Sequence, residues 1–188
     1  MIVVNHMETK AEIYQSFADQ QSMKRALDLY GERLMRFANC YVNDIYQAED
    51  IMMETFVELL VRKPVFENEF QFRAYLYRTA KNKSINYLNR HKKLVPLDEQ
   101  VLVDIADLEK TLYRTALEQK LRQAMQKINA RYRQVIVLSY FDGLKNPEIA
   151  EVLNLNEKAV GNLKHRAKQK LNRVLSKENF IFTDKGEL

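Results

Sequence analysis

Apolar residues recur in this chain at steps of three and four, over long stretches that glycine and proline hardly interrupt. The 188 residues include only four Gly and three Pro. Steps of three or four return to the same face of an α-helix, whereas a strand alternates at every second residue. Turn-rich β folds also use Gly and Pro far more often. The sequence therefore predicts an all-α protein.

The first half predicts three helices, over Lys24–Val42, about Tyr46–Arg62 and about Gln71–Asn89. The second helix is expected to end before Pro64, because the residue before a proline avoids the helical conformation. One stripe of this helix is predicted to be buried, with Leu60 at its edge: Ala48, Ile51, Met52, Thr55, Phe56 and Leu59.

The opposite face of the second helix mixes carboxylates with apolar side chains. No Lys or Arg occurs between Phe37 and Val61. The residues expected on this face are Asp50, Met53, Glu54, Val57 and Val61. An exposed face that is both acidic and apolar suits a basic protein partner and excludes nucleic acid.

The third helix is basic, with no acid between Gln71 and Lys93. One stripe carries groups that can bind base edges or phosphates: Tyr75, Arg78, Asn82, Asn86 and Asn89. Before it come Phe66, Phe70 and Phe72, in or beside a loop, where aromatic rings could stack on unpaired bases. Core packing is the alternative, favoured for Phe72 and equally weighted for the other two.

An acidic connector separates this half from the next. It contains Pro96 and shows no helical period until about Leu108, so the domain boundary is placed there. Such a connector leaves two arrangements open. The domains could stay apart, or they could close face to face and hide both DNA surfaces.

The second half has the signals of a helix-turn-helix. Asn129 can cap a helix that stops at Asp142-Gly143, and Asn146 is expected to cap a short helix over Pro147–Leu153. Asn154 is then expected to be left-handed, Leu155 to fill the core and Asn156 to cap the last helix.

The last helix is expected to bury Val160, Leu163, Ala167, Leu171 and Val174. Its other side is basic and polar: Lys158, Asn162, His165, Arg166, Gln169 and Arg173. A helix of this kind, after a short capped helix and a tight turn, fits the major groove. By itself a basic amphipathic helix could also bind RNA, a membrane or an acidic protein.

Both halves resemble one family. AEDIMMETFVELL and FRAYLYRTAKNKSINYLNR resemble the second conserved region of the bacterial RNA polymerase sigma-70 family, and RYRQVIVLSYFDGLKNPEIAEVLNLNEKAVGNLKHRAKQKL resembles the fourth. The lack of room for regions one and three points to the extracytoplasmic-function (ECF) group. The sequence departs from the family pattern at Lys164, a position usually apolar, and at Leu163, usually polar.

The resemblance implies five segments: a variable N-terminal segment (1–22), region two (23–92), an acidic linker (93–112), region four (113–176) and a tail (177–188). It implies a sigma factor that binds core RNA polymerase through the β′ clamp helices and β flap and recognises promoter DNA. An anti-sigma factor is a further implied partner.

The resemblance also assigns site residues. The residues assigned to binding of core polymerase are Asp50, Met53, Glu54 and Val57. Recognition and melting of the downstream promoter element fall on Phe66, Phe70, Tyr75, Tyr77, Arg78, Asn82 and Asn86. Recognition of the upstream element falls on Lys158, Gly161, Asn162, His165 and Arg166.

Other classes fit less well. The three His are far apart, Cys40 has no cysteine partner, and no glycine-rich phosphate loop occurs, so we expect no catalysis, metal or cofactor. With no apolar run of transmembrane length and no secretory signal, we expect a cytoplasmic protein without membrane insertion. The alternative function is a stand-alone helix-turn-helix regulator, which leaves the second basic surface unexplained.

Overall fold

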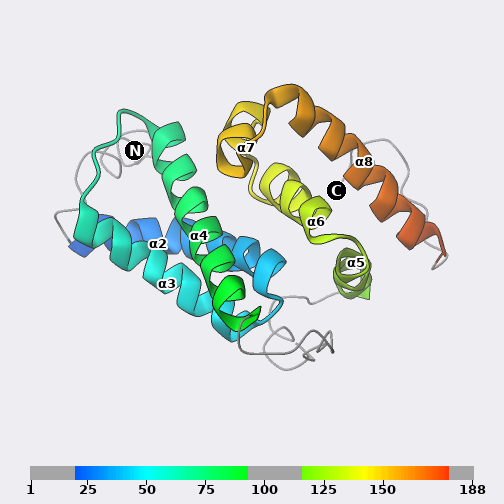
Figure 1. Ribbon diagram of the computed structural model, residues 1–188, viewed down its shortest axis with the longest axis horizontal. Helices are drawn as coiled ribbons and strands as arrows, with labels where there is room; N and C mark the ends of the chain where they lie inside the picture. The colour runs from blue at the N-terminus through cyan, green and yellow to red at the C-terminus, as the bar shows by residue number, and fades with distance from the viewer. Residues whose placement is uncertain (1–19, 93–115, 178–188) are drawn as a thin grey trace, which may run out of the picture.

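The computed structural model describes residues 20–92 and 116–177, and every regular element in these two ranges is helical. The all-α prediction is thereby confirmed for this part of the chain. In Figure 1 the helices form two neighbouring groups, which we call the first domain (α2–α4) and the second domain (α5–α8). The predicted linker, and most of the predicted N-terminal segment and tail, lie outside the described residues.

The first domain consists of α2 (Gln20–Val42), α3 (Ile45–Arg62) and α4 (Glu69–Lys92). Asp44 caps α3 because its Oδ1 accepts hydrogen bonds from the backbone N–H of Tyr46 at 2.9 Å and of Gln47 at 3.2 Å. The helix ends at Lys63, which is left-handed with a φ of 46°. The backbone N–H of Lys63 donates to the Leu59 carbonyl.

Helix α4 is longer than predicted at both ends. A reciprocal pair of hydrogen bonds marks its beginning. The Asn68 side chain accepts from the Gln71 backbone N–H, and the Gln71 side chain accepts from the Glu67 backbone N–H, both at 3.0 Å. These bonds satisfy donors that no helical carbonyl reaches.

Aromatic rings fill the centre of the first domain. Phe37 and Tyr77 meet edge to face at 5.3 Å between ring centroids, and Tyr30 meets Phe72 at 5.4 Å. The predicted buried stripe of α3 is confirmed in all six residues. Leu60, which was placed at the edge of the stripe, is instead 40 % exposed.

The second domain consists of α5 (Ala116–Gln126), α6 (Ala130–Ile136), a π-helical turn η2 (Val137–Phe141), α7 (Asn146–Leu153) and α8 (Glu157–Lys177). Asn129 caps α6 as predicted, since its Oδ1 accepts from the Arg131 backbone N–H at 2.8 Å. The π turn was not predicted from the sequence, and it closes with a 2.9 Å hydrogen bond from the Asp142 backbone N–H to the Val137 carbonyl.

The prediction that Asn146 caps α7 is wrong. Asn146 is the first helical residue, and Glu148 closes the end instead by accepting from the Lys145 backbone N–H at 2.7 Å. Leu155 packs against the core as predicted, partly buried, and the predictions for Asn154 and Asn156 are confirmed. Asn154 is left-handed, with a φ of 55°, and Asn156 caps α8 by accepting from the Ala159 backbone N–H at 2.7 Å.

The departure from the family pattern in α8 is accommodated without rotating the helix. Leu163 packs against the core, and Lys164 lies beside it, only partly buried. The Lys164 Nζ donates to the Asn146 Oδ1 at 3.2 Å and lies 5.7 Å from the centre of the Tyr140 ring. Of the predicted buried stripe of α8, Val160 and Ala167 are buried, and Leu163, Leu171 and Val174 pack partly buried against the core. Leu175 joins them at 2 % exposure.

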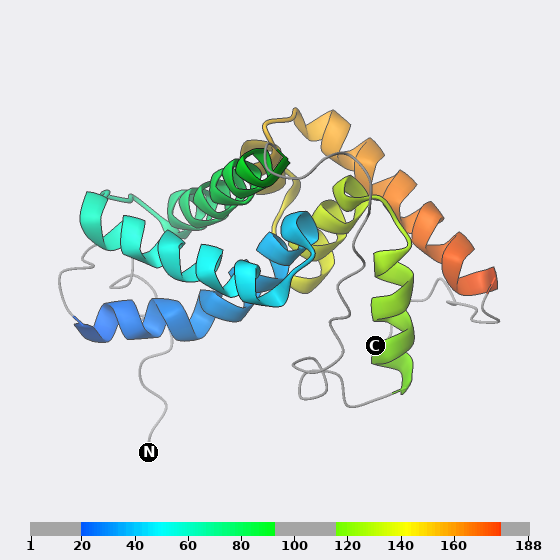
Figure 2. The same ribbon diagram turned by 60° about the horizontal axis from the view of Figure 1, so that its bottom comes forward.

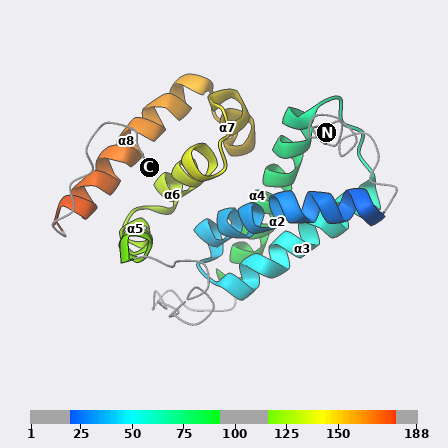
Figure 3. The ribbon, with the colours of Figure 1, turned by 180° about the vertical axis from the view of Figure 1, so that it is seen from behind.

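The two domains are in contact. Helix α7 packs against α4, and α6 packs against α2, so that the buried apolar residues of both domains form one cluster. Figure 3 shows the same contact from behind. The structure is closed in that the domains are in contact, but this contact does not hide both predicted DNA surfaces, because the basic side of α8 stays exposed.

Candidate nucleic-acid and protein-binding surfaces

The acidic face of α3 is exposed, as the sequence predicts. We call Asp50, Met53, Glu54 and Val57 the docking ridge. Met53 is 48 % exposed and Val57 is 54 % exposed. Leu60 and Val61 extend the apolar part of the ridge by another turn. Exposed apolar side chains that gather on one helix face are typical of a surface that binds a protein.

Only part of the acidic charge of α3 is open to a partner. The Lys83 Nζ of α4 lies 3.3 Å from the Glu54 carboxylate and 3.0 Å from the Glu58 carboxylate. Asp50, in contrast, makes no ion pair with any described residue and is exposed. It is therefore the ridge carboxylate that a cationic partner would meet first.

The polar stripe of α4 reaches solvent over most of its length. We call Phe70, Tyr75, Arg78, Asn82 and Asn86 the downstream face. The two asparagines are exposed, Tyr75 is partly buried, and Phe70 is 38 % exposed at the beginning of the helix. Sequence reasoning missed Val65, which is 86 % exposed in the preceding loop. The available signal in the sequence was the position of Val65 in a loop, between Pro64 and Phe66.

Two residues assigned to the downstream element lie in the interior instead. Phe66 is 6 % exposed and makes edge-to-face contacts with Phe72 at 5.3 Å and Tyr75 at 5.4 Å. Tyr77 is fully buried, and burial followed by the neighbouring Asp142 carboxylate raises its pKa well above 10. Neither ring is accessible to a nucleobase in this conformation.

Helix α7 of the second domain lies against α4 beside the downstream face (Figure 1). Arg78 forms a 3.4 Å ion pair with Glu151. Lys81 donates from Nζ to the Val152 carbonyl at 2.7 Å, and burial, followed by the charge of Arg78, lowers its pKa. These two cations of α4 are therefore engaged by the second domain.

Helix α8 lies at the outer edge of the molecule, as Figure 2 shows. We call Lys158, Gly161, Asn162, His165 and Arg166 the upstream face, and all but Gly161 are classed as exposed. A side chain at Gly161 would meet no atom within 4 Å, so packing does not require glycine there. Glycine inside a helix costs about 1 kcal/mol relative to alanine, and its lack of a side chain leaves the backbone of α8 open to close approach here.

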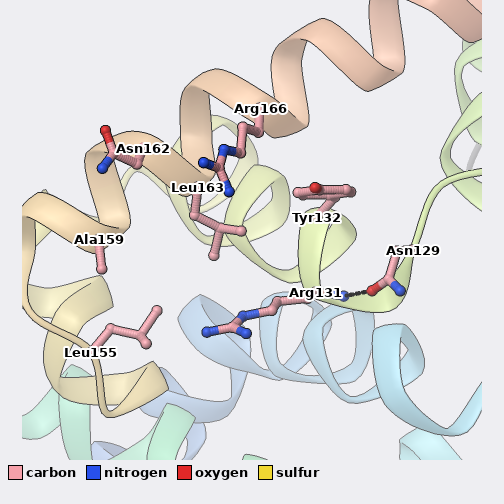
Figure 4. Close-up of a pocket in the computed structure, with 8 residues that line it drawn as sticks. All are labelled: Asn129, Arg131, Tyr132, Leu155, Ala159, Asn162, Leu163 and Arg166. Atoms are coloured by element: carbon pink, nitrogen blue, oxygen red, sulfur yellow. Dashed lines mark hydrogen bonds between the residues drawn. The ribbon is translucent and has the colours of Figure 1, made fainter.

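A groove of about 390 Å³ lies between α8 and the beginning of α6. Asn162, Leu163 and Arg166 line it from α8, and Asn129, Arg131 and Tyr132 line it from the α6 side. In Figure 4 the Arg166 side chain extends from α8 between Leu163 and Tyr132. Two arginines at one groove next to the upstream face provide positive charge for a phosphate.

Other kinds of site are not found in the described ranges. These residues contain no group of three His, Cys, Asp or Glu side chains that could hold a metal ion. Cys40 is buried, and burial raises the pKa of its thiol to about 12, so it is a poor nucleophile. No helix in this part of the chain is both long and apolar enough to cross a bilayer.

This fold and these surfaces define a class: helical two-domain proteins that bind DNA through a helix-turn-helix. Residues 27–94 match Sigma-70 region 2, and residues 118–171 match Sigma-70, region 4. The chain belongs to the sigma-70 family, in its ECF group.

Individual relatives agree. The ECF RNA polymerase sigma factor SigW of Bacillus subtilis (strain 168) is 28 % identical over 169 residues, which cover 84 % of this chain and 90 % of SigW. The structure of CnrH with the cytosolic domain of CnrY has a TM-score of 0.62 at 23 % identity and covers 91 % of this chain and 97 % of that one. RpoE of Bartonella quintana, solved with the anti-sigma factor NepR, has a TM-score of 0.65 at 19 % identity and covers 83 % and 98 %.

Proposed function

We propose that this protein is the sigma factor that directs core RNA polymerase to a set of promoters. Members of the family are DNA-binding initiation factors, not enzymes. The observation that supports this function best is the combination of surfaces: an acidic and apolar ridge on α3, a basic amide-rich α4 and an exposed basic α8. A stand-alone regulator needs only the last of these.

Each surface has a part in the proposal. The docking ridge binds the β′ clamp helices of core polymerase, and the second domain binds the β flap. The upstream face holds duplex DNA in the major groove, where Asn162 and Arg166 can bind base edges and Lys158 a phosphate. The downstream face takes up bases that leave the duplex during melting, with Phe70 available for stacking.

The proposal includes an inhibitor and a location. Because the RpoE structure is a complex with an anti-sigma factor, we infer that this chain also has an anti-sigma partner. The chain would work in the cytoplasm, where core polymerase and the chromosome are. No cofactor of its own takes part.

Run-off transcription with purified core polymerase and a genomic promoter library tests the function. We expect defined transcripts only when both the chain and core polymerase are present. Footprinting separates the alternative, because a stand-alone regulator would protect duplex DNA without polymerase. Failure to initiate at any promoter in the absence of inhibitors would overturn the proposal.

A further inference from the structure

A lysine of α4 reaches across to carboxylates of α3, one of which belongs to the docking ridge. The Lys83 Nζ lies 3.3 Å from the Glu54 Oε2 and 3.0 Å from the Glu58 Oε2. Successive residues of a helix are about 100° apart, so Lys83 leaves α4 on a different side from its neighbour Asn82 of the downstream face. Lys83 therefore adds its charge to the docking ridge, although it belongs to another helix.

The carboxylates along α3 differ in how far cations of the chain neutralise them. Glu58 is paired twice, with Lys83 and with the Arg62 Nε at 2.9 Å, and 28 % of its side chain is exposed. Glu54 is 65 % exposed, and Lys83 is the one cation that pairs with it among the described residues. Glu54 is therefore a carboxylate that faces a partner and also belongs to an internal ion pair.

The Lys83 ammonium is held on the inner side of this pair by the protein. Only 21 % of the Lys83 side chain is exposed. Tyr75 lies beside it: burial, followed by the Glu58 charge, raises the pKa of Tyr75, and Lys83 is among the groups that oppose this rise. A lysine with few open directions loses less conformational freedom when it pairs than a fully exposed one does. Its pairing with Glu54 is therefore largely formed before any partner arrives.

A basic partner at the docking ridge meets this lysine in two ways. A partner cation that binds Glu54 has to share the carboxylate with Lys83 or displace it. The Lys83 charge also repels that cation, since charges act over about 10 Å at 0.1 M salt. The association rate of charged proteins follows the summed charge of the patch that they approach. Lys83 should therefore slow the binding of a basic surface to the docking ridge.

We propose that Lys83 is an internal competitor for the docking ridge, which occupies Glu54 in the free chain and lowers both the rate and the affinity with which a basic protein surface binds there. The inference rests on the proposed function, which identifies that surface as part of core polymerase. It adds to that function a residue outside α3 whose charge opposes binding.

Substitutions at this one position separate charge from packing. Lys83→Met removes the charge and keeps an unbranched side chain, and Lys83→Gln is a second uncharged variant that keeps the test informative if K83M does not fold. Lys83→Arg keeps the charge. Lys170→Met is the matched control, because it removes the same charge at an exposed position of α8, which lies far from α3 in Figure 1.

Stopped-flow association of the full chain with fluorescently labelled core polymerase measures the effect. At about 0.1 M salt we expect K83M and K83Q to associate about threefold faster than the wild type. K83R and K170M should associate at nearly the wild-type rate. The gain should disappear at about 0.5 M salt, where exposed charges are screened. Equal rates for K83M and wild type at low salt, or a gain that salt does not reduce, would overturn the proposal.

A double-mutant cycle tests whether Lys83 acts through Glu54. In the Glu54→Gln background the competitor has lost the ridge carboxylate that it occupies, so K83M should increase the association rate by a much smaller factor than in the wild-type background. The same gain in both backgrounds would show that Lys83 does not compete for Glu54.

A purely structural role for Lys83 predicts the opposite sign. If the lysine only joined α4 to α3, K83M would lower the free energy of unfolding in urea and would bind core polymerase more slowly. A slower rate in folded K83M therefore rejects the inference and leaves the proposed function intact. If neither the wild type nor any variant binds core polymerase, the proposed function itself is refuted, and this inference with it.

Discussion

Asp142 is the residue whose surroundings depend most on the meeting of the two domains. Burial raises the pKa of its carboxyl to about 6, and Arg36, then Tyr77, then Arg33 and Arg73 oppose this effect only in part. In a chain with separated domains the carboxyl would be in water, with a pKa near the ordinary 3.8. The Asp142 carboxyl therefore binds its proton more tightly when the two domains are in contact than when they are separated.

We accordingly predict that contact between the two domains becomes more favourable as pH falls from about 6 to about 4. Above about pH 6 proton binding by Asp142 no longer favours the contact. The difference of about two pKa units allows at most about a hundredfold change in the closing equilibrium. Scattering at pH 5 and pH 7.5 should show a more compact chain at pH 5.

Asp142→Asn provides the control for the pH experiment, because the amide has no proton to bind and the acids Glu148 and Glu151 remain. The arginines around Asp142 do not titrate, and the pKa values of Tyr77 and Cys40 lie far above this range. D142N should stay closed with the same radius of gyration at both pH values. An equal pH response in the variant and wild type would exclude Asp142 as its source.

Arg166 lies on the upstream face, where its guanidinium can bind either a base edge or a phosphate. If it binds a base edge, Arg166→Ala should cost about 1 to 3 kcal/mol at particular upstream base pairs. The measurement is the affinity of the holoenzyme for promoters with single base-pair changes. Arg173→Ala, on the same exposed side of α8, is the matched control. A loss that is uniform across all promoters would instead mark a phosphate contact.

At the scale of elements, the beginnings of α7 and α8 show that the same sequence signal for a cap can lead to different hydrogen bonds. Asparagine before a short helix predicts a cap at both Asn146 and Asn156, yet only Asn156 accepts from a backbone N–H of its helix. At α7 the capping bond is made by Glu148, and the Asn146 amide is free to accept from Lys164.

The two asparagines should therefore differ in their effect on stability. We expect Asn156→Ala to lower the free energy of unfolding by about 1 kcal/mol and Asn146→Ala by less than about half of that. Urea unfolding followed by circular dichroism measures both. A larger loss for Asn146→Ala than for Asn156→Ala would instead indicate that Asn146 caps α7, as the sequence predicts.

Asn82 and Asn86 of α4 are exposed, and we predict that they bind unpaired bases during melting. Replacing Asn82 or Asn86 with Ala should reduce formation of the open complex, measured by permanganate reactivity of thymines, more than binding of the holoenzyme to duplex promoter. Exposed Gln123→Ala on α5 serves as the control. Equal losses in melting and duplex binding would contradict a role in capturing bases.

At the scale of the whole molecule, the docking ridge is independent of closure because it faces solvent in the closed chain. Asp50→Lys combined with Val57→Ala should weaken association with core polymerase by about tenfold or more, since it removes a charge contact and apolar area together. Asp28→Lys, a charge reversal at an exposed position on α2, is the matched control and should bind core polymerase normally. Unchanged affinity would remove the ridge from the proposed function.

Much of the fold could be predicted from the sequence because its signals are local. Period and capping fixed the helices, including the left-handed Asn154 and the cap at Asn156, and the period of α3 placed its apolar ridge residues outside. The candidate surfaces of α3 and α8 follow from the same geometry, since exposure on a helix is set by its angular position.

Contacts across the chain were decided only by the tertiary structure. Phe66 and Tyr77 lie in periodic or aromatic contexts that fit a surface as well as a core, and only packing buried them. Arg78 and Glu151 are 73 residues apart, and Arg36 and Asp142 are 106 apart. No local pattern pairs charges at such separations, because their meeting depends on how two folded domains dock. The sequence by itself determined the helices and their faces, and the docking of the domains decided which of those faces is covered.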